Sequence, residues 1–600
     1  MNVVVIAGIL ITVATGIPVF LQLRRHPKGL FVLFFAEMWE RFSYYGMRGI
    51  LIFYLTQHFL FDDVAAAGQY GAYTSLVYLL PLIGGSLADR YLGTRKAIAF
   101  GALLMVAGQL LMAVEGPPSR QFLVFQDQRY EFQITGRANE RDSKLIVDGT
   151  AYAFGTRNGG ELVIEGLPAG VSLPSQLAPG SYRTVAERDP FYVTLLYLAL
   201  SLIIMGVGFL KPNISSIVGQ LYPQGDPRRD PGFTLYYYGI NLGAFWSSVL
   251  CGLLGQTVGW WAGFGLAGIG MFAGYVVFVR GKPWLEGRGE PPDPENLKRP
   301  LAGPLSMEHL IYLGAILGVG LVYLLVQRNA AVGGLLALGS IVSLGYIGWY
   351  IFVKTERIER ERMLLAIVLI FGAVVFFTLF EQAGSSLNLF ADRNVRLPNS
   401  RFFTVTAAQT QSFNAGFILI GAPLFAGLWA YLGRIGREPD PLIKFGLGLF
   451  QVGFGFLVLV WSQGFADAEY RMPMMVLAVA YLFHTTGELC LSPVGLSEIT
   501  KLSVPALLST MMAIWFLSSS WAQYIGAFIA QMAGTETVGG RVLDPALALN
   551  TSLSVFNMIG WVGVGSGIAF FVLSPFLRRW AHDAEVTVAP QKTAAQNPAE

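Results

Sequence analysis

Ionisable and phenolic residues stand close together in the otherwise apolar segment EMWERFSYYGMR, residues 37–48. Glu37, Glu40, Arg41, Tyr44 and Arg48 fall within about 100° of arc if the segment is a helix with about 100° per residue. Two acids beside two arginines favour internal ion pairs, and a carboxylate in such a pair changes its protonation when its partner moves away. This pattern predicts a proton-coupled switch. The alternative is a static ion-pair network that fixes helix packing.

Further ionisable residues lie inside long apolar stretches. Glu381 in FTLFEQAGSS and Glu488 in HTTGELCLSP should face a cavity, because a charge at the bilayer centre costs about 2.5–3.5 kcal/mol. Lys211 precedes Pro212, which lacks a backbone donor and bends or breaks a helix, so this pair suits a moving gate. Alternatively, Lys211 snorkels towards a helix end. His484 is either a core residue or a proton relay.

Polar and aromatic side chains recur along the same stretches. A zwitterionic ligand needs anionic groups at its amine, cationic groups at its carboxylate and aromatic walls between them, and the sequence supplies all three. Aromatic residues make up 13% of the chain, so each one taken singly fits core packing or a lipid-facing position better than a ligand contact. The residues of this set are Tyr45, Tyr78, Tyr237, Asn241, Gln382, Asn414, Ser492 and Trp515.

The composition indicates lipid as the solvent. Of the 600 residues 54% are hydrophobic and only 13% are charged, against about 25% charged in soluble domains. A net charge of +3 without an extended basic patch excludes a nucleic-acid partner. Cys251 and Cys490 lie in apolar runs, which argues against a disulfide framework or a zinc site. No nucleophile, metal cluster or phosphate loop has a convincing spacing, so we do not expect an enzyme.

Apolar stretches long enough to span a bilayer fall into groups of six, two and six. The first six lie near 30–57, 68–88, 97–114, 191–221, 233–255 and 260–279. The middle two lie near 304–326 and 331–353, and the last six near 363–390, 402–432, 441–462, 472–500, 505–533 and 553–577. A polar, proline-rich linker separates the first group from the second.

Basic residues near the ends of these stretches predict the orientation, because cytoplasmic loops carry an excess of Lys and Arg. Most of them fall on one side, and only the loop 392–401 carries basic residues on the other. We expect a bacterial inner-membrane protein with a cytoplasmic C-terminus. The residues on the predicted cytoplasmic side are Arg90, Arg95, Lys96, 354–362, Arg434, Arg437, Arg578 and Arg579.

Two segments lie outside this pattern. Residues 3–23 predict an extra helix with its N-terminus outside, and a cleaved signal peptide is the alternative. Residues 115–190 alternate apolar and polar positions between Asp-Gly and Asn-Gly turns, which predicts a small periplasmic β domain, either functional or a mere appendage.

The resulting division of the chain runs from the extra helix to a polar tail. The segments are 1–26 (extra helix), 27–114 (first three helices of the first bundle), 115–190 (periplasmic β-rich insert), 191–280 (its last three helices), 281–303 (cytoplasmic linker), 304–354 (lateral helix pair), 355–580 (second six-helix bundle) and 581–600 (disordered cytoplasmic tail).

Several segments resemble known transporter motifs. GGSLADRYLGTRK, residues 84–96, is similar to a loop of the major facilitator superfamily, and EMWERFSYYG, residues 37–46, resembles the ExxERFxYY signature of the proton-dependent oligopeptide transporters, the POT family. FTLYYYGINLGAF, LFEQAGS and GELCLSPVGLS also resemble that family. The resemblance implies an all-α polytopic fold of two six-helix bundles, with a lateral helix pair as in bacterial members.

The resemblance also implies roles in proton coupling and gating. Glu37, Glu40 and Arg41 would couple protons together with Glu381. An Arg48–Glu381 pair would close the periplasmic side, and a Lys211–Glu488 pair would form the other gate. The loop motif places Asp89, Arg90, Arg95 and Lys96 at the cytoplasmic gate.

Substrate contacts follow from the same resemblance. Arg48 and Lys211 would meet a peptide carboxylate, and the amino end would be held by Asn241, Asn414 and Glu488. The pocket walls would be Tyr45, Tyr78, Ser492 and Trp515, of which Tyr78 and Trp515 rest, like Asn414, on local context alone.

The implied activity is proton-coupled import of di- and tripeptides by alternating access. Animal members use a histidine on the second helix, but the corresponding YGAYTSLVY contains none, which leaves coupling to the carboxylates. We expect a monomeric unit in the lipid bilayer with protons as coupling ion and no other cofactor. The alternatives are another solute on the same scaffold, such as an amino acid, nitrate or a drug-like molecule, and a peptide sensor or scaffold whose periplasmic domain binds the ligand.

Overall fold

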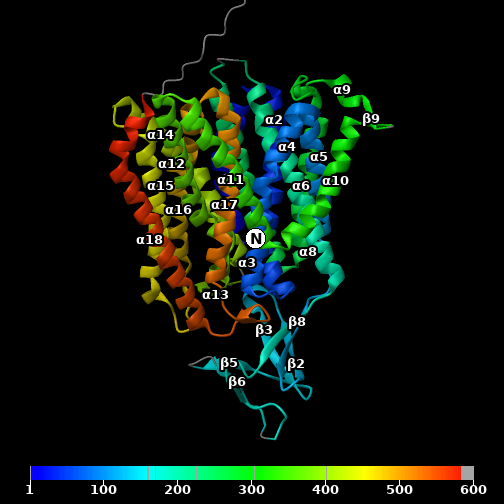
Figure 1. The fold of residues 1–600 in the computed structure, drawn as a ribbon. Helices are drawn as coiled ribbons and strands as arrows, with labels where there is room; N and C mark the ends of the chain where they lie inside the picture. Colours follow the sequence, from blue (N-terminus) through cyan, green and yellow to red (C-terminus); the bar gives the residue numbers. More distant parts are fainter. Residues whose placement is uncertain are drawn as a thin grey trace, which may run out of the picture.

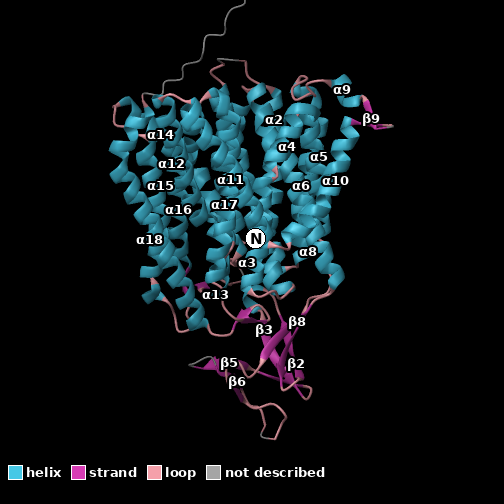
Figure 2. Ribbon diagram, viewed as in Figure 1, coloured by secondary structure: helices cyan, strands magenta, loops and turns pink. Residues whose placement is uncertain are grey.

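The computed structural model describes residues 2–157, 161–168, 170–223, 226–302, 304–400 and 402–582. The polar tail from residue 583 onwards and the Asn-Gly turn at 158–159 lie outside the described residues. Within them, 13 helices are long and apolar enough to cross a membrane. α2 (Lys28–Phe53) and α17 (Leu508–Met532) are as long but more polar. The arrangement is helical with small β-sheets, as expected (Figures 1 and 2).

The helices form two bundles of six, a lateral pair and one extra helix. The first bundle contains α2, α3 (Asp63–Leu79) continued by α4 (Pro81–Leu87), α5 (Thr94–Met112), α6 (Pro190–Gln220), α7 (Arg229–Thr257) and α8 (Trp260–Arg280). The lateral pair is α10 (Met307–Val326) and α11 (Asn329–Lys354). The second bundle contains α12 (Arg357–Phe380) continued by α13 (Ser386–Arg393), α14 (Ser412–Arg434), α15 (Pro441–Trp461), α16 (Met474–Leu502), α17 and α18 (Pro545–Leu577).

The bundles meet along two pairs of helices. α3 packs against α17, and α7 packs against α14. The lateral helix α10 lies on α6, and α11 lies on α17 and α3. The extra helix α1 (Val3–Leu23) lies on α7 and α14, where the Trp246 indole donates to the Thr12 hydroxyl at 2.9 Å. Most of its other side chains are exposed, as on a helix that faces lipid.

Two helices begin eight or more residues away from the position that the hydropathy indicates. α18 begins at Pro545, eight residues before the predicted start, because Asp544 caps the helix by accepting from the Leu547 amide and proline suits the first turn. α14 begins at Ser412, ten residues after the predicted start, because Asn399 and Thr404 form a β-bridge in the preceding loop. α6 runs through Pro212 without interruption.

The β insert, residues 120–187, holds two antiparallel sheets. The larger has the order β4 (Thr150–Tyr152), β3 (Asp142–Val147), β2 (Gln128–Thr135), β1 (Arg120–Phe125) and β8 (Arg183–Glu187). The smaller contains β5 (Phe154–Arg157), β6 (Glu161–Ile164) and β7 (Gln176–Leu177). The predicted Asp148-Gly149 turn joins β3 to β4, with φ of 50° and 80°, as a two-residue hairpin requires.

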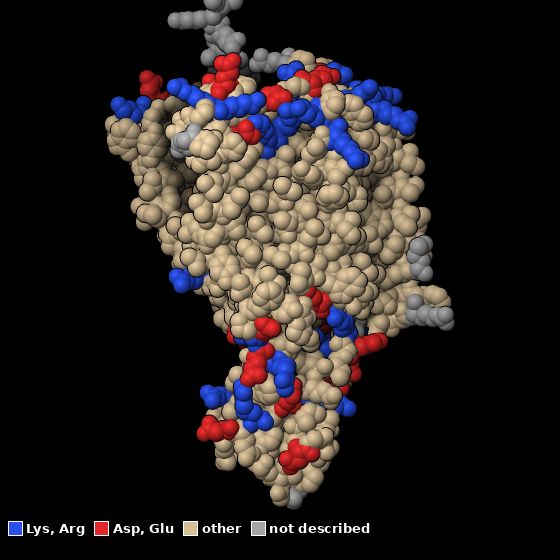
Figure 3. Space-filling model, turned by 90° about the vertical axis from the view of Figure 1, so that its right-hand side faces the viewer, with Lys and Arg blue, Asp and Glu red and all other residues tan. Residues whose placement is uncertain are grey.

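Charge is distributed unevenly along the molecule. Figure 3 shows Lys and Arg gathered at the end opposite the β insert, a largely uncharged belt over the helices and both signs on the insert. The linker helix α9 (Pro294–Lys298) lies at the end opposite the insert (Figure 1). Arg393 belongs to the segment 392–401, which carries basic residues on the side opposite the predicted cytoplasmic side. Its side chain is buried in an ion pair with Asp63, so this arginine stabilises helix packing and does not indicate the orientation of the chain.

Candidate functional site

A cavity of about 160 Å³ lies between the two bundles. Both bundles supply its walls: α2 and α7 from the first, and the end of α12, α14 and α16 from the second. The residues singled out from the sequence that line it are Tyr45, Arg48, Tyr237, Asn241, Glu381, Asn414, His484 and Glu488. The cavity therefore collects ionisable and amide side chains from segments more than 400 residues apart.

Arg48 forms the cationic wall of this cavity. Its Nη2 donates to Oε2 of Glu381, and its Nε donates to the Tyr70 hydroxyl at 2.7 Å. Both charged side chains are largely buried, with 6% and 12% exposed. Glu381 stands where α12 passes into the single turn η5 (Glu381–Gly384), so the pair joins the two bundles. Removing one partner from a buried pair is costly because the other charge is left uncompensated.

Glu488 forms the acidic wall on α16. One of its carboxylate oxygens accepts from the Asn414 Nδ2 at 3.2 Å, and the same amide nitrogen donates to the Thr485 hydroxyl at 3.1 Å. Asn241 of α7 also faces the cavity. The cavity thus offers a guanidinium and a carboxylate on residues of opposite bundles.

The predicted stripe on α2 forms one buried cluster beside the cavity. The Arg41 Nε lies 2.8 Å from Oε1 of Glu37 and 3.1 Å from Oε2 of Glu40. The two carboxylates are about 1% exposed or less. Both oxygens of Glu40 have no hydrogen-bond donor in the described structure. Arg41 is therefore the direct ion-pair partner of both buried acids.

Lys211 does not contact Glu488 as the resemblance implied. Its Nζ lies 3.7 Å from the centroid of the Tyr78 ring and interacts electrostatically with the acids of α2 instead. The partner of Glu488 is Asn414. The reason for the difference is placement: Lys211 on α6 points into the first bundle towards α2 and α3, whereas Glu488 projects into the cavity from α16. In this conformation the predicted second gate pair is separated.

The predicted gate loop contacts the linker and the lateral helix. The Arg95 Nη2 lies 2.5 Å from Oε1 of Glu290, and the Lys96 Nζ lies 2.6 Å from Oε2 of Glu308 on α10. Asp89 and Arg90 are exposed at the same end. Their role as a gate against the second bundle stays a prediction.

Three predicted pocket residues lie away from the cavity: Tyr78, whose ring packs against Lys211, and also Ser492 and Trp515. Ser492 and Trp515 are partly buried and are not among the residues that line it. Trp515 instead lies against α16, beside Gly495. Their substrate roles rested on local context or motif position, and this conformation does not bring them to the site.

Other cavity residues lay beyond the sequence reasoning. Gln411 and Tyr481 line the cavity, and Tyr70 binds Arg48 from α3. A tyrosine seven residues before Glu488 lies on the same helix face, which is the signal that would have found Tyr481. His484, for which the sequence predicted either a core position or a proton relay, also lines the cavity, and the centroid of its ring lies 4.6 Å from that of Phe456.

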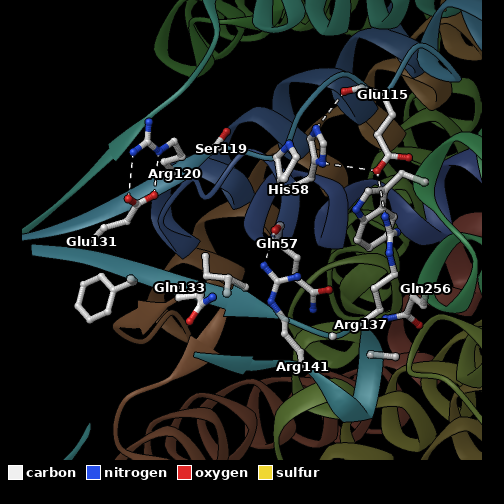
Figure 4. Close-up of a pocket in the computed structure, with 16 residues that line it drawn as sticks. Gln57, His58, Glu115, Ser119, Arg120, Glu131, Gln133, Arg137, Arg141 and Gln256 are labelled. Atoms are coloured by element: carbon white, nitrogen blue, oxygen red, sulfur yellow. Dashed lines mark hydrogen bonds and ion pairs between the residues drawn. The ribbon is translucent and has the colours of Figure 1, made fainter. Parts of the chain in front are cut away.

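A second cavity, of about 320 Å³, lies where the β insert meets the helices (Figure 4). Glu115 accepts from Arg137 at 3.3 Å, and Arg141 donates to the backbone oxygen of Gln57. His58 lies beyond the end of α2, and burial lowers its pKa to about 4 despite the attraction of Glu115. Burial also lowers the pKa of Arg141 to about 10. The contacts of Arg137 with Glu115 and of Arg141 with Gln57 fasten the insert to the first bundle.

A catalytic or metal centre is not evident at either cavity. Among the described residues there is no group of three or more His, Cys, Asp or Glu side chains placed to hold a metal ion. The two cysteines are buried and free. The chemistry available at the central cavity is binding of charged groups and transfer of protons.

Known proteins match this chain over nearly its full length. The sequence profile of the POT family matches residues 95–542. An uncharacterised transporter of Bacillus subtilis is 31% identical, covering 92% of this chain and 95% of the relative. Dipeptide and tripeptide permease B of Xenorhabdus bovienii is 29% identical, covering 92% and 96%.

Solved structures agree with the sequence matches. A peptide transporter POT solved in complex with alafosfalin has a TM-score of 0.69 and 31% identity, with 92% of this chain and 96% of that chain covered. These findings confirm the predicted fold class, the expectation of a transporter rather than an enzyme, and the predicted family. This chain is a multi-pass membrane transporter that belongs to the POT family.

Proposed function

We propose that this protein imports di- and tripeptides together with protons by alternating access of the central cavity. The observation that carries the proposal is the pair of opposite charges on the cavity walls, Arg48 from the first bundle and Glu488 from the second. A small peptide is a zwitterion whose two ends require such groups. Relatives of this chain are named as dipeptide and tripeptide permeases, which supports the same substrate class.

Binding of the peptide carboxylate would act on the gate. Arg48 is held by Glu381 in this structure, so a substrate carboxylate competes with Glu381 for the guanidinium. A Glu381 carboxylate that loses this partner is left in a largely buried site, which favours its protonation. Proton uptake and peptide binding are thereby linked through one arginine.

The cluster on α2 supplies a second place for a proton. Arg41 is shared between Glu37 and Glu40, and both Glu40 oxygens lack a hydrogen-bond donor. A proton on one of these carboxylates relieves the cost of a buried acid without a donor. We assign Glu37, Glu40 and Arg41 to proton coupling, with protons as the coupling ion and no other cofactor.

We place the β insert on the periplasmic side of the inner membrane. Lys and Arg gather at the opposite end of the helices (Figure 3), and such an excess is typical of the cytoplasmic side. The Arg48–Glu381 pair then closes the periplasmic side. Each monomer would act as one transport unit in the bilayer, with the C-terminus in the cytoplasm.

A second candidate substrate is another small molecule that carries an amine and a carboxylate. The cavity volume of about 160 Å³ suits a small ligand in this conformation. A POT family transporter that is 27% identical to this chain was solved in complex with 5-aminolevulinic acid, which carries both groups. Competition between this compound and di-alanine would separate the two substrates.

The test is uptake of labelled di-alanine into proteoliposomes with and without an inward proton gradient. We expect accumulation with the gradient and its loss in Glu37→Gln, whereas Glu187→Gln serves as the matched control because Glu187 is about half exposed on the insert. Absence of di-alanine uptake under every gradient would overturn the peptide assignment. Equal accumulation by wild type and Glu37→Gln would overturn the role of the α2 acids.

A further inference from the structure

The hydrophobic core of the β insert is shared between the two halves of the transporter. The insert is part of the first half, between α5 and α6, and its core contains Leu123, Phe132 and Leu145. Val538 belongs to the same core and is 2% exposed, although it comes from the loop between α17 and α18 of the second half. Leu543, at the end of that loop, packs against the same core.

Hydrogen bonds surround this apolar contact. Oε1 of Gln121 accepts from the Gly539 amide at 2.7 Å, and the Thr156 hydroxyl donates to the Leu543 oxygen at 2.8 Å. Arg141 reaches both halves, because it donates to the backbone oxygens of Gly539 and of Gln57 at the end of the first helix of the first bundle. Side chains and backbone of the loop are therefore both fixed by the insert.

The backbone conformation of the α17–α18 loop permits this close contact with the insert. Its short hairpin, β13 (Thr537–Val538) and β14 (Arg541–Val542), turns through Gly539 and Gly540, which have φ of 60° and 77°. A Cβ added at Gly539 would lie 2.4 Å from the Ser143 Oγ, so only glycine permits both the turn and the approach.

The root of the insert is fixed to the first half. Arg188 donates to the backbone oxygens of Phe59 and Leu60 at 2.6 and 2.7 Å. The Ser119 amide donates to the His58 oxygen at 3.0 Å. The insert thus cannot follow the second half without breaking contacts at its own base.

The insert lies on the same side as other contacts between the halves. The Gln57 amide donates to Asp392 of α13 at 3.0 Å, and Arg393 pairs with Asp63 nearby. Separation of the bundles on this side moves the α17–α18 loop away from the first half. Val538 would then leave the core of the insert and become exposed to water.

We propose that the β insert is a latch that holds the transporter closed on the side of the insert by binding the α17–α18 loop of the other half. This inference rests on the proposed alternating access. The latch sets how often the cavity opens to that side, and it accounts for an insert whose core is completed by a residue of the opposite bundle.

The test compares Val538→Ala with Leu547→Ala, its control, because Leu547 is 59% exposed just beyond the loop. The reporter is Ser248→Cys, which lines the cavity and bonds only its own helix, in a background with Cys251 and Cys490 replaced by Ser. A membrane-impermeant maleimide is applied from the side of the insert. We expect labelling about tenfold faster in Val538→Ala, since two buried methyl groups are lost, and unchanged labelling in Leu547→Ala.

A second variant tests the latch independently of whether Val538→Ala folds. Residues 120–187 are replaced by a short Gly-Ser linker, which can close the gap because Arg120 and Glu187 are paired neighbours on β1 and β8. We expect faster labelling and continued di-alanine uptake. Equal labelling rates in wild type, Val538→Ala and the deletion, with uptake intact, would refute the latch alone. Absence of uptake in wild type would refute the proposed substrate, while the labelling rates would still decide whether the latch exists.

Discussion

A buried ion pair between Asp63 of α3 and Arg393 of α13 joins the two bundles on the side of the insert. The Arg393 Nη1 and Nη2 lie 2.5 and 2.7 Å from the two Asp63 oxygens, and the Thr535 amide also donates to Asp63 at 2.8 Å. The side chains are 7% and 2% exposed. Arg393→Met should therefore destabilise the closed state.

The expected magnitude follows from burial. Removing one partner of a buried, bidentate pair costs about 3–5 kcal/mol, because the remaining charge is uncompensated. Opening on this side returns Asp63 to water, so the cost falls on the closed state. Each 1.4 kcal/mol corresponds to about a tenfold change in an equilibrium, so the open fraction should rise by about a hundredfold or more.

The assay is maleimide labelling of the Ser248→Cys reporter in Arg393→Met, Asp63→Asn and the double variant. The labelling rate of the double variant should be lower than the rate expected if the free-energy changes of the two single variants were additive, because neither charge is then buried alone. The control is Arg120→Met, which breaks the exposed Arg120–Glu131 pair and should change labelling less than about fivefold.

Two results would refute this reasoning. Labelling of Arg393→Met no faster than that of Arg120→Met would show that the pair does not hold the closed state. Additive effects in the double variant would show that Asp63 and Arg393 act independently.

Three further predictions concern other groups. Burial lowers the pKa of His58 to about 4, below the unfolded value of about 6.5. This group therefore contributes up to about 3 kcal/mol of stability above pH 6.5, and that contribution is lost as the pH falls towards 4. The fall in Tm over this window should be smaller in His58→Gln than in wild type, and equal slopes of Tm against pH in the two proteins would contradict this. Glu488→Gln should weaken di-alanine binding about tenfold to a hundredfold and leave N-acetylated di-alanine unaffected, measured by competition; equal losses for both ligands would contradict a contact with the amine. Tyr78→Leu should slow di-alanine uptake about tenfold, whereas Tyr78→Phe should retain it, because the Lys211 Nζ lies 3.7 Å from the centroid of the Tyr78 ring. Equal uptake rates in the two variants would contradict a cation–π role.

The helices and the α2 cluster could be predicted from the sequence because they depend on local periodicity. Hydropathy finds the apolar stretches, and the 100° repeat places Glu37, Glu40 and Arg41 on one face of α2. The contact between Arg48 and Glu381 needed a family resemblance, since nothing local joins residues 333 positions apart.

Long-range partners account for what sequence reasoning missed. In the sequence alone, Arg393 counts as a basic residue that indicates the orientation of the chain, whereas the structure shows that it pairs with Asp63 of α3. Val538 looks like an ordinary loop residue, because its burial depends on a sheet formed some 400 residues earlier. Lys211 was paired with Glu488 by analogy, whereas its partner in this conformation is the ring of Tyr78.

Proton flux driven by peptide is the measurement that bears most directly on the proposed symport. Proteoliposomes with a pH-sensitive dye inside, and without an imposed pH gradient, receive di-alanine while uptake of the peptide is followed in parallel. We expect acidification of the lumen that begins with peptide uptake and is abolished in Glu37→Gln. Peptide uptake by wild type without acidification would contradict proton coupling.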